Sequence, residues 1–337
     1  QQKDYFSKKY DTADGQYDIY ILFNELAERI LKISGKLGFI QPNKFLGSEY
    51  GLKLLFLFKK KFALNHIWNV SLEKVFSNAS VYPYVFVMTK SNRDQQQESN
   101  IHMFDLGDES CFEGFGKQYK LYTRLKNILE KTEPLGSHIE YIQRGVPNSK
   151  IDIDTKGDYK AYKSKDLSSP YFNYNSSSVI TYKNSQYAQE KEKEFENEMV
   201  ILPRTVLKLR ATLKSGRVHV LDRIYYIVGK ENDFSNELLL AILNSEIMDK
   251  FYEFYFGSTK VGGGYYDLKG SQIRSLPVPK NPDTNLVKEI EILVNKYISL
   301  KKEAEDSKIT TTQVMQIDKS LNSIQEQIDL LVDKLYN

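Results

Sequence analysis

The alternation of helix and strand patterns in residues 17–89 constrains the fold of this chain more than any other feature. Apolar side chains recur at helical spacing in two segments, and short apolar runs follow each of them. In chain order, the expected elements are a helix at 17–33, a strand at 37–40 that Pro42 ends, a helix at 48–62, and strands at 66–70 and 81–89. This order predicts half of a doubly wound α/β sheet that finishes in an antiparallel hairpin.

Each of these helices is expected to bury one apolar face. The inward residues should be Tyr20, Phe23, Leu26, Ile30 and Ile33 in the first helix, and Leu52, Leu55, Phe58 and Phe62 in the second. Gly35 is expected to stop the first helix, as glycine often does one residue beyond a helix end. Half a sheet exposes an apolar edge, so another segment or a partner is expected to cover it.

The middle of the chain has shorter elements. Residues 91–100 are polar throughout and are expected to form a linker or loop. From about 101 to 280, the pattern indicates short strands, turns and one clear helix. That helix is Glu237–Phe256, which should turn Leu239, Ile242, Leu243, Ile247 and Phe251 toward a core. Segments 173–178 and 190–198 are expected at the surface.

The chain is expected to be helical from Pro279 to its end. Two runs of apolar residues have heptad spacing: Leu286, Ile290, Leu293, Tyr297 and Leu300, then Val314, Ile317, Leu321, Ile324, Ile328, Leu331 and Leu335. A polar stretch near 307–312 separates the runs. This pattern predicts an antiparallel helical hairpin.

Composition excludes several classes of protein. No run of 18 apolar residues is present, so a transmembrane helix is not expected. The single cysteine, Cys111, excludes an internal disulfide framework and fits a reducing cytoplasm. The four histidines have no metal-ligand spacing, and no metal is expected in this chain. The net charge of +3 indicates little by itself.

Two segments beside the expected sheet carry candidate site residues. Lys74-Val75-Phe76 precedes the last strand, and Gln41-Pro42-Asn43-Lys44-Phe45 follows a strand end, where open α/β sheets place ligands. With the order of the elements, they resemble the back half of a TaqI-like adenine-N6 DNA methyltransferase domain. The resemblance implies that Phe76 stacks on the flipped target base, and that Asn43 and Lys44 lie near its pocket. The residues alone also allow a core position for Phe76 and a turn without chemistry.

Further motifs follow in order between residues 137 and 279. They are Tyr141-Ile142-Gln143-Arg144-Gly145-Val146-Pro147, Tyr162–Leu167, Leu202–Arg210, Leu238–Ser245, and Gly262-Gly263-Gly264-Tyr265-Tyr266-Asp267-Leu268 to Ile273–Pro279. In this order and spacing they resemble the target-recognition domain of TaqI-like enzymes and type I specificity subunits. The resemblance implies binding to double-stranded DNA.

The candidate DNA-binding residues are basic or aromatic side chains in or close to these motifs. They are Arg144, Lys163, Lys165, Arg204, Lys208, Arg210, Lys214, Lys260, Tyr265 and Tyr266. Aromatic rings beside lysines suit a surface on which bases stack and phosphates are bound. An AT-rich genome, which encodes many Lys, Asn and Tyr codons, would give a similar composition, so composition alone leaves both explanations open.

The resemblance implies three parts: residues 1–95 as the C-terminal half of a Rossmann-like methyltransferase sheet, 100–280 as an α+β target-recognition domain, and 281–337 as a helical spacer or hairpin. The family transfers a methyl group from S-adenosylmethionine to adenine N6. Its Asn-Pro-Pro-Tyr motif and its glycine-rich cofactor motif are absent from these 337 residues. The chain alone is therefore expected to be inactive and to need an upstream methyltransferase segment or subunit, as in a type IIG restriction-modification polypeptide.

Two other functions remain open at this point. One is a stand-alone specificity subunit that docks separate methyltransferase and nuclease chains; a second recognition domain would favour it, and only one is visible. The other is a protein-interaction module with a tyrosine-rich surface. The recognised DNA sequence does not follow from these motifs.

Overall fold

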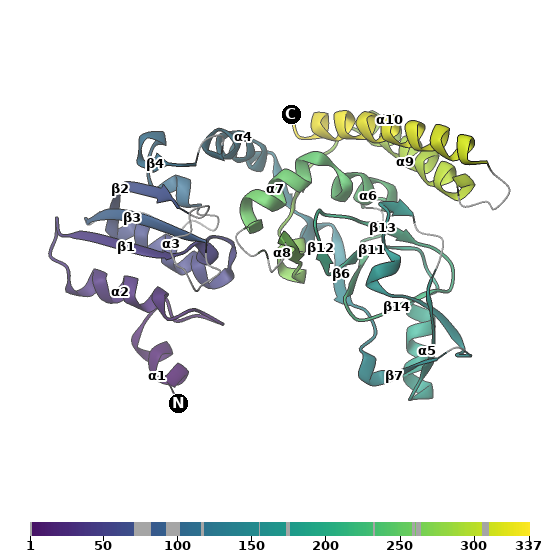
Figure 1. Cartoon of the computed structure of the whole chain (residues 1–337), viewed down its shortest axis with the longest axis horizontal. Helices are drawn as coiled ribbons and strands as arrows, with labels where there is room; N and C mark the ends of the chain where they lie inside the picture. Colours follow the sequence, from purple (N-terminus) through teal and green to yellow (C-terminus); the bar gives the residue numbers. More distant parts are fainter. Residues whose placement is uncertain are drawn as a thin grey trace. The chain divides into compact units, whose positions relative to one another are not determined.

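The computed structural model describes residues 2–70, 82–91, 102–115, 118–154, 156–172, 176–231, 233–257, 260, 264–304 and 310–337 (Figure 1). The chain divides into two compact units. Unit 1 comprises Gln1–Lys126 and Glu253–Lys260, and unit 2 comprises Asn127–Tyr252 and Val261–Asn337. Within the described residues, no helix is both long enough and apolar enough to cross a membrane.

Unit 1 is built on one mixed sheet. Its elements are α1 (Gln2–Lys9), α2 (Tyr20–Ile30), β1 (Lys36–Pro42), η1 (Asn43–Gly47), α3 (Glu49–Lys61), β2 (Phe62–Asn69), β3 (Pro83–Lys90), η2 (Met103–Leu106), η3 (Glu109–Cys111), β4 (Phe112–Glu113) and α4 (Gln118–Glu130), whose last turn belongs to unit 2. The strand order is β1-β3-β2-β4. Strand β3 is antiparallel to both β1 and β2, which therefore run in the same direction on either side of it.

The core of unit 1 differs from the expected one on α2. Ile21, Leu22 and Ala27 are buried there, whereas Phe23 is 53% exposed and Ile30 is 72% exposed. The sequence pattern was misleading because α2 also buries Asn24 and Glu25, two polar residues that have hydrogen-bond partners. The predicted inward face, with Ile33 at 56% exposure, thus lies largely at the surface.

Two smaller expectations for unit 1 were also wrong. Helix α2 ends at Ile30, and the residue with a left-handed backbone is Ser34, at φ 66°, rather than Gly35. On α3, Leu55 and Phe58 are buried as expected, but Leu52 is 46% exposed. The expected loop at 91–100 lies outside the described residues except for Ser91.

Unit 2 contains many short strands and several helices. Its elements are β5 (Thr132–Pro134), η4 (Leu135–Ser137), β6 (Ile139–Arg144), η5 (Asn148–Lys150), β7 (Ile151–Asp154), β8 (Tyr159–Tyr162), η6 (Ser164–Asp166), β9 (Tyr171–Phe172), β10 (Ser178–Tyr182), α5 (Ser185–Glu194), β11 (Met199–Pro203), β12 (Thr205–Val206), β13 (Thr212–Lys214), β14 (His219–Val220), β15 (Ile224–Gly229), α6 (Asn236–Asn244), α7 (Glu246–Phe256), β16 (Tyr266–Asp267), α8 (Gly270–Arg274), β17 (Pro277–Pro279), α9 (Thr284–Ala304) and α10 (Thr311–Leu335). The end of α7 belongs to unit 1.

Two sheets share the core of unit 2. Their strand orders are β14-β8-β10-β7 and β6-β15-β11-β13-β9. One cluster of buried residues draws on both sheets, with Ile180 from β10 and Ile201 and Tyr226 from β11 and β15. Strand β12 pairs with β16 in a separate ribbon. The expectation of a single helix between 101 and 280 was wrong, because α4 and α5 also lie there.

The predicted helix at 237–256 is two helices that meet at Ser245. All five of its predicted inward residues are buried. The backbone of Ser245 is extended, and its hydroxyl accepts a hydrogen bond from the amide of Met248, so it caps the start of α7. The last two helices, α9 and α10, lie side by side (Figure 1). Helix α10 buries Ile317, Leu321, Ile324 and Ile328 from its heptad series, together with Val332.

Candidate nucleic-acid interface

Three arginines lie at one end of the five-stranded sheet of unit 2. Arg144 is the last residue of β6 and pairs with Tyr225 on β15. Strand β11 pairs with β15 on its other side, and Arg204 directly follows β11. The backbone amide of Arg204 donates to the carbonyl of Arg223 at 2.7 Å. Because the ends of β6, β15 and β11 are neighbours in the sheet, Arg144, Arg223 and Arg204 lie next to one another. We call Arg144, Arg204 and Arg223 the arginine end.

Carboxylates hold two of these arginines. Arg144 lies 2.5 Å from Asp222, and the side chain of Arg144 is 48% exposed. Arg204 donates to both oxygens of Asp267, at 2.8 and 2.9 Å, and its side chain is 34% exposed. These hydrogen bonds raise the pKa of Arg204. Bidentate pairing fixes the plane of a guanidinium, so Arg204 is oriented and still reaches solvent.

Arg223 is the residue of this group that sequence reasoning missed. It occupies the third position of a turn closed by a hydrogen bond from the amide of Ile224 to the carbonyl of Leu221, at 3.2 Å. Its φ is 73°, a conformation that costs a residue with a Cβ about 1–2 kcal/mol. Glycine or asparagine usually fills this position. The signal in the sequence is a short turn before a strand, Asp222-Arg223, that lacks both residues.

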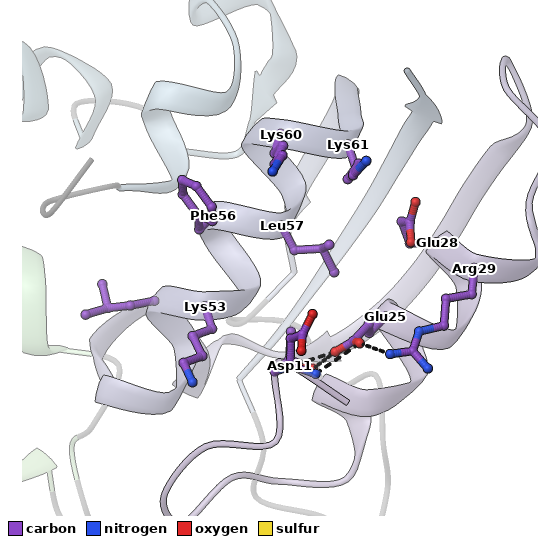
Figure 2. A pocket seen from close by; sticks show the side chains of 11 residues that line it. Asp11, Glu25, Glu28, Arg29, Lys53, Phe56, Leu57, Lys60 and Lys61 are labelled. Atoms are coloured by element: carbon purple, nitrogen blue, oxygen red, sulfur yellow. Dashed lines mark hydrogen bonds and ion pairs between the residues drawn. The ribbon is translucent and has the colours of Figure 1, made fainter. Parts of the chain in front are cut away.

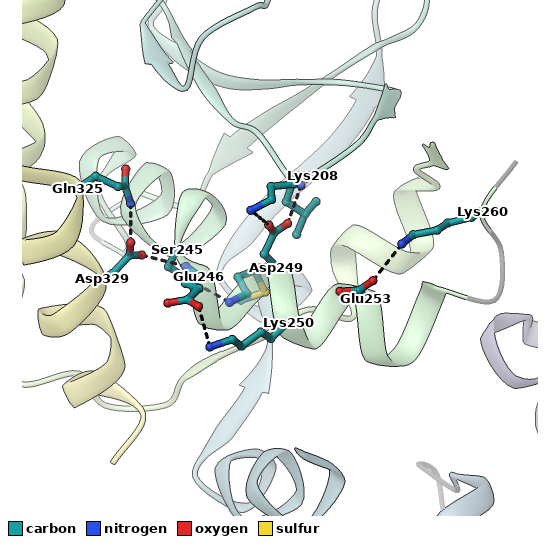
Figure 3. A network of polar contacts seen from close by, with 11 residues as sticks. Lys208, Ser245, Glu246, Asp249, Lys250, Glu253, Lys260, Gln325 and Asp329 are labelled. Atoms are coloured by element: carbon teal, nitrogen blue, oxygen red, sulfur yellow. Dashed lines mark hydrogen bonds and ion pairs between the residues drawn. The ribbon is translucent and has the colours of Figure 1, made fainter. Parts of the chain in front are cut away.

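Lys208 and Arg210 lie beyond β12 on the same unit. The side chain of Lys208 is 83% exposed and lies 3.6 Å from Asp249, whose other oxygen accepts from the amide of Leu209 (Figure 3). Arg210 is half-buried and donates to the carbonyl of Ser168. Lys208 is therefore accessible to a phosphate, whereas Arg210 already helps to hold a loop.

The remaining candidates are scattered. Lys165 is exposed on η6, and Lys163 is half-buried just before it. Tyr265 is 40% exposed, but Tyr266 is 3% exposed and packs edge-on against Tyr252. Lys260, which belongs to unit 1, lies 3.0 Å from Glu253. A role for Tyr266 in direct stacking on DNA is not supported, since its ring belongs to the core.

Lys214 requires a correction. It is 0% exposed, and its ammonium donates to the backbone carbonyls of Phe195 and Asn197. Burial lowers the pKa of Lys214 to about 8. The sequence suggested a phosphate contact because Lys214 lies in the most basic stretch of the chain. In the structure, Lys214 instead points inward and supplies hydrogen-bond donors to two backbone carbonyls of the loop after α5.

In unit 1, the turn after β1 has a polar interior. Asn43 is 9% exposed, and its backbone N–H donates to the carbonyl of Tyr82 at 2.9 Å. Nearby, the side-chain amide of Asn24 donates to that of Gln41 at 2.8 Å. Within the described residues, Asn24 Oδ1, Gln41 Nε2 and Asn43 Oδ1 are buried without hydrogen-bond partners. Lys44 is exposed, and Phe76 lies outside the described residues.

A pocket of about 800 Å³ opens between α2 and α3 of unit 1 (Figure 2). Glu25 lies in its wall and accepts hydrogen bonds from Thr12, the amide of Asp11, and Arg29. Burial would raise the pKa of Glu25, but these hydrogen bonds outweigh burial and lower it. Because acidic and basic side chains alternate around this pocket, it favours no single class of ligand. Within the described residues, no group of three or more potential ligands could hold a metal ion.

Two segments of the chain match families of known proteins. Residues 1–76 match the Eco57I restriction-modification methylase family, and residues 149–278 match the TaqI-like C-terminal specificity domain. A curated relative is the type II restriction enzyme and methyltransferase RM.Eco57I of Escherichia coli, which is 36% identical over 92 residues. That match covers 27% of this chain and 9% of the relative. The expected resemblance to restriction-modification methylases and to the TaqI-like specificity domain is therefore confirmed.

Two solved structures match most of the chain. The type IIL restriction-modification enzyme MmeI in complex with DNA matches at a TM-score of 0.54 and 12% identity, over 93% of this chain and 48% of that one. The type IIG restriction endonuclease BpuSI matches at a TM-score of 0.41 and 16% identity, over 95% of this chain and 50% of that one. The first likeness shows a common fold. The chain spans about half the length of each enzyme.

Proposed function

We propose that this chain is the C-terminal, DNA-reading part of a site-specific adenine-N6 DNA methyltransferase in a restriction-modification system. The order of the two matched segments carries the proposal: methylase sequence comes first, and a specificity domain follows in the same chain. A stand-alone specificity subunit would not need the methylase segment. We assign residues 1–95 to the methyltransferase domain, 100–280 to target recognition and 281–337 to a helical spacer.

Double-stranded DNA is the proposed ligand of unit 2. The arginine end and the exposed Lys208 supply guanidinium and ammonium groups, which bind phosphates and base edges in protein–DNA interfaces. Asp222 and Asp267 hold two of the arginines in place. We assign secondary contacts to Lys165 and Tyr265, which are exposed. We assign the protein to the cytoplasm, a reducing compartment in which the single cysteine, Cys111, stays a free thiol.

An upstream methyltransferase segment is the proposed partner of unit 1. Strand β1 is at one edge of the sheet, where its backbone can pair with a further strand. Exposed apolar side chains lie along α2 and directly beside its ends. They are Ile19, Phe23, Ile30 and Ile33, and each is more than half exposed. An apolar stripe of this kind is what a missing layer of an α/β sheet would cover.

The upstream segment would supply the chemistry. S-adenosylmethionine, when bound there, provides the methyl group, and the absent Asn-Pro-Pro-Tyr motif would hold the adenine amine. From this chain, Phe76 would stack on the flipped base and Asn43 would line its pocket. Asn24 Oδ1 and Gln41 Nε2 are buried without hydrogen-bond partners, and they support a pocket for a polar base at this position. The base would supply the donor and the acceptor that these two atoms lack.

Two measurements test this function. Calorimetry of the 337-residue chain with S-adenosylmethionine should give no binding, because the cofactor motifs are absent; stoichiometric binding at micromolar affinity would refute the proposed division of labour. Methyl transfer to duplex DNA should appear only when a methyltransferase segment that carries Asn-Pro-Pro-Tyr is added. Transfer to cytosine rather than adenine would overturn the assigned base.

A further inference from the structure

We infer that Arg223 reads the major-groove edge of a guanine in the recognised DNA site. The inference rests on the proposed function of unit 2 as a DNA reader and goes beyond it by assigning a residue and a base. Arg223 is exposed and has a left-handed backbone conformation. Its two neighbours in the arginine end, Arg144 and Arg204, are paired with carboxylates.

The conformation of Arg223 is imposed by its surroundings. Its carbonyl accepts from the amide of Arg204 at 2.7 Å, and the preceding residue, Asp222, donates its amide to Val146 at 2.8 Å. A Cβ at Gly145 would lie 2.4 Å from the carbonyl oxygens of Val220 and Leu221, so β6 packs closely against the same turn. The turn is therefore fixed from both neighbouring strands.

A residue in such a strained position points to a directional role. Backbone strain persists only where the fold over-determines it, and it concentrates where a ligand is held. A phosphate contact needs no such precision, since a lysine or arginine on any flexible surface segment can supply it. A base edge does need it, because the groups to be read lie at fixed positions in the groove.

The charge of the arginine end also favours a base over phosphates. Three guanidinium groups and two carboxylates, Asp222 and Asp267, leave a net charge of 3 − 2 = +1. The carboxylates oppose the binding of a phosphate, which carries a full negative charge, more strongly than the binding of a neutral base. In the described part of the chain, the guanidinium of Arg223 has no carboxylate partner, so its donors remain available.

The identity of the base follows from the shape of the guanidinium. Two parallel N–H groups of arginine match O6 and N7 of guanine, which is the commonest specific contact between proteins and DNA. Lysine carries the same charge but lacks this fork. The inference therefore predicts that Arg223→Lys keeps the general attraction to DNA and loses the preference for one guanine.

The experiment selects duplexes from a library with a randomised central segment, using the full 337-residue chain, and reads the enriched sequence. The parent should enrich a consensus that contains guanine. Arg223→Gly and Arg223→Lys should enrich the same consensus with one guanine position lost, and should bind the parent's site about 10- to 100-fold more weakly. Because glycine accepts a left-handed backbone, Arg223→Gly should fold at least as well as the parent.

The outcomes separate the inference from the function on which it rests. If the parent enriches a consensus and both variants enrich it unchanged, Arg223 does not read a base, and the proposed function stands. If Arg223→Gly loses affinity equally for all sequences, with a salt slope smaller by about 0.9, while Arg223→Lys binds them like the parent, Arg223 binds a phosphate and the inference is wrong. If the parent binds no duplex, both fail. Lys319→Asn, an exposed lysine on α10, is the control and should change nothing.

Discussion

The two units differ in how completely their apolar residues are covered. Unit 2 closes its core between two sheets, and the inward residues predicted for α6 and α7 are all buried. Unit 1 buries the side of α2 that carries Asn24 and Glu25 and leaves the predicted apolar face exposed. The apolar residues predicted to face inward on α6 and α7 thus lie in a core, whereas most of those predicted for α2 lie at the surface. An apolar pattern in the sequence can therefore mark a contact with another segment rather than a core within the chain.

The sharpest test of this difference compares two apolar residues of unit 1. Leu54 is 0% exposed on α3, so Leu54→Ala should destabilise the chain by about 2–5 kcal/mol. Phe23 is 53% exposed, so Phe23→Ala should cost about 0.5 kcal/mol or less. Urea unfolding followed by circular dichroism measures both. An equally large loss for Phe23→Ala would mean that the α2 face is covered within this chain, and the contrast between the units would disappear.

The next prediction concerns Phe76 in the full-length enzyme. Stacking of a base on an aromatic ring contributes roughly 1–3 kcal/mol, so Phe76→Ala should lower methylation by about one to two orders of magnitude. The melting temperature should remain nearly unchanged. Phe86→Ala is the matched control: Phe86 is 1% exposed on β3, and its loss should cost about 3–5 kcal/mol of stability. A large drop in the melting temperature of Phe76→Ala, with methylation per folded molecule intact, would place Phe76 in the core.

Acid should destabilise both units through one buried histidine in each. Burial lowers the pKa of His102 to about 4 although Asp105 opposes the shift, and burial lowers the pKa of His219 to about 4 with help from Lys214. The unfolded chain therefore binds protons first as pH falls. The free energy of unfolding should decrease between about pH 6.5 and 4.

Urea unfolding at pH 7 and pH 5 of His102→Gln and His219→Gln checks this acid sensitivity. Each variant should lose less stability on acidification than the parent. Parent-like sensitivity in both variants would mean that other groups cause the acid effect.

The smallest expected effect is that of a single phosphate contact. Lys208→Ala should weaken binding to all duplexes similarly and lower the log–log salt slope by about 0.9, because the side chain is 83% exposed. Lys214→Met is the contrasting variant: Lys214 is 0% exposed, so the salt slope should not change. Fluorescence anisotropy at several salt concentrations provides both values. A slope reduced by Lys214→Met and not by Lys208→Ala would mean that Lys214, and not Lys208, contacts a phosphate.

The sequence predicted where helices and strands lie better than it predicted which of their residues are buried. Periodicity located α3, β3 and both terminal helices within a few residues, because these segments have long regular patterns. It failed on α5, because this helix is polar along most of its length and has no apolar stripe. The break at Ser245 had a local signal, a serine followed by an acidic first turn.

The candidate site was harder to predict because it depends on neighbours distant in the sequence. Basic composition suggested Lys214, which the fold buries, and not Arg223, whose proposed role follows from its left-handed backbone in a turn. Arg144 and Arg204 were predicted as single contacts. Their pairing with Asp222 and Asp267 is a tertiary property that spacing along the chain does not encode.

The central claim is that unit 2 reads DNA while unit 1 awaits a partner, and the salt dependence of DNA binding by the 337-residue chain tests it most directly. Binding to a random-sequence duplex, measured between 50 and 200 mM salt, should weaken with a log–log slope steeper than about −2, as expected for two or more phosphate contacts. The same chain should transfer no methyl group. A slope near zero would contradict the account, because unit 2 would then make no phosphate contacts with DNA.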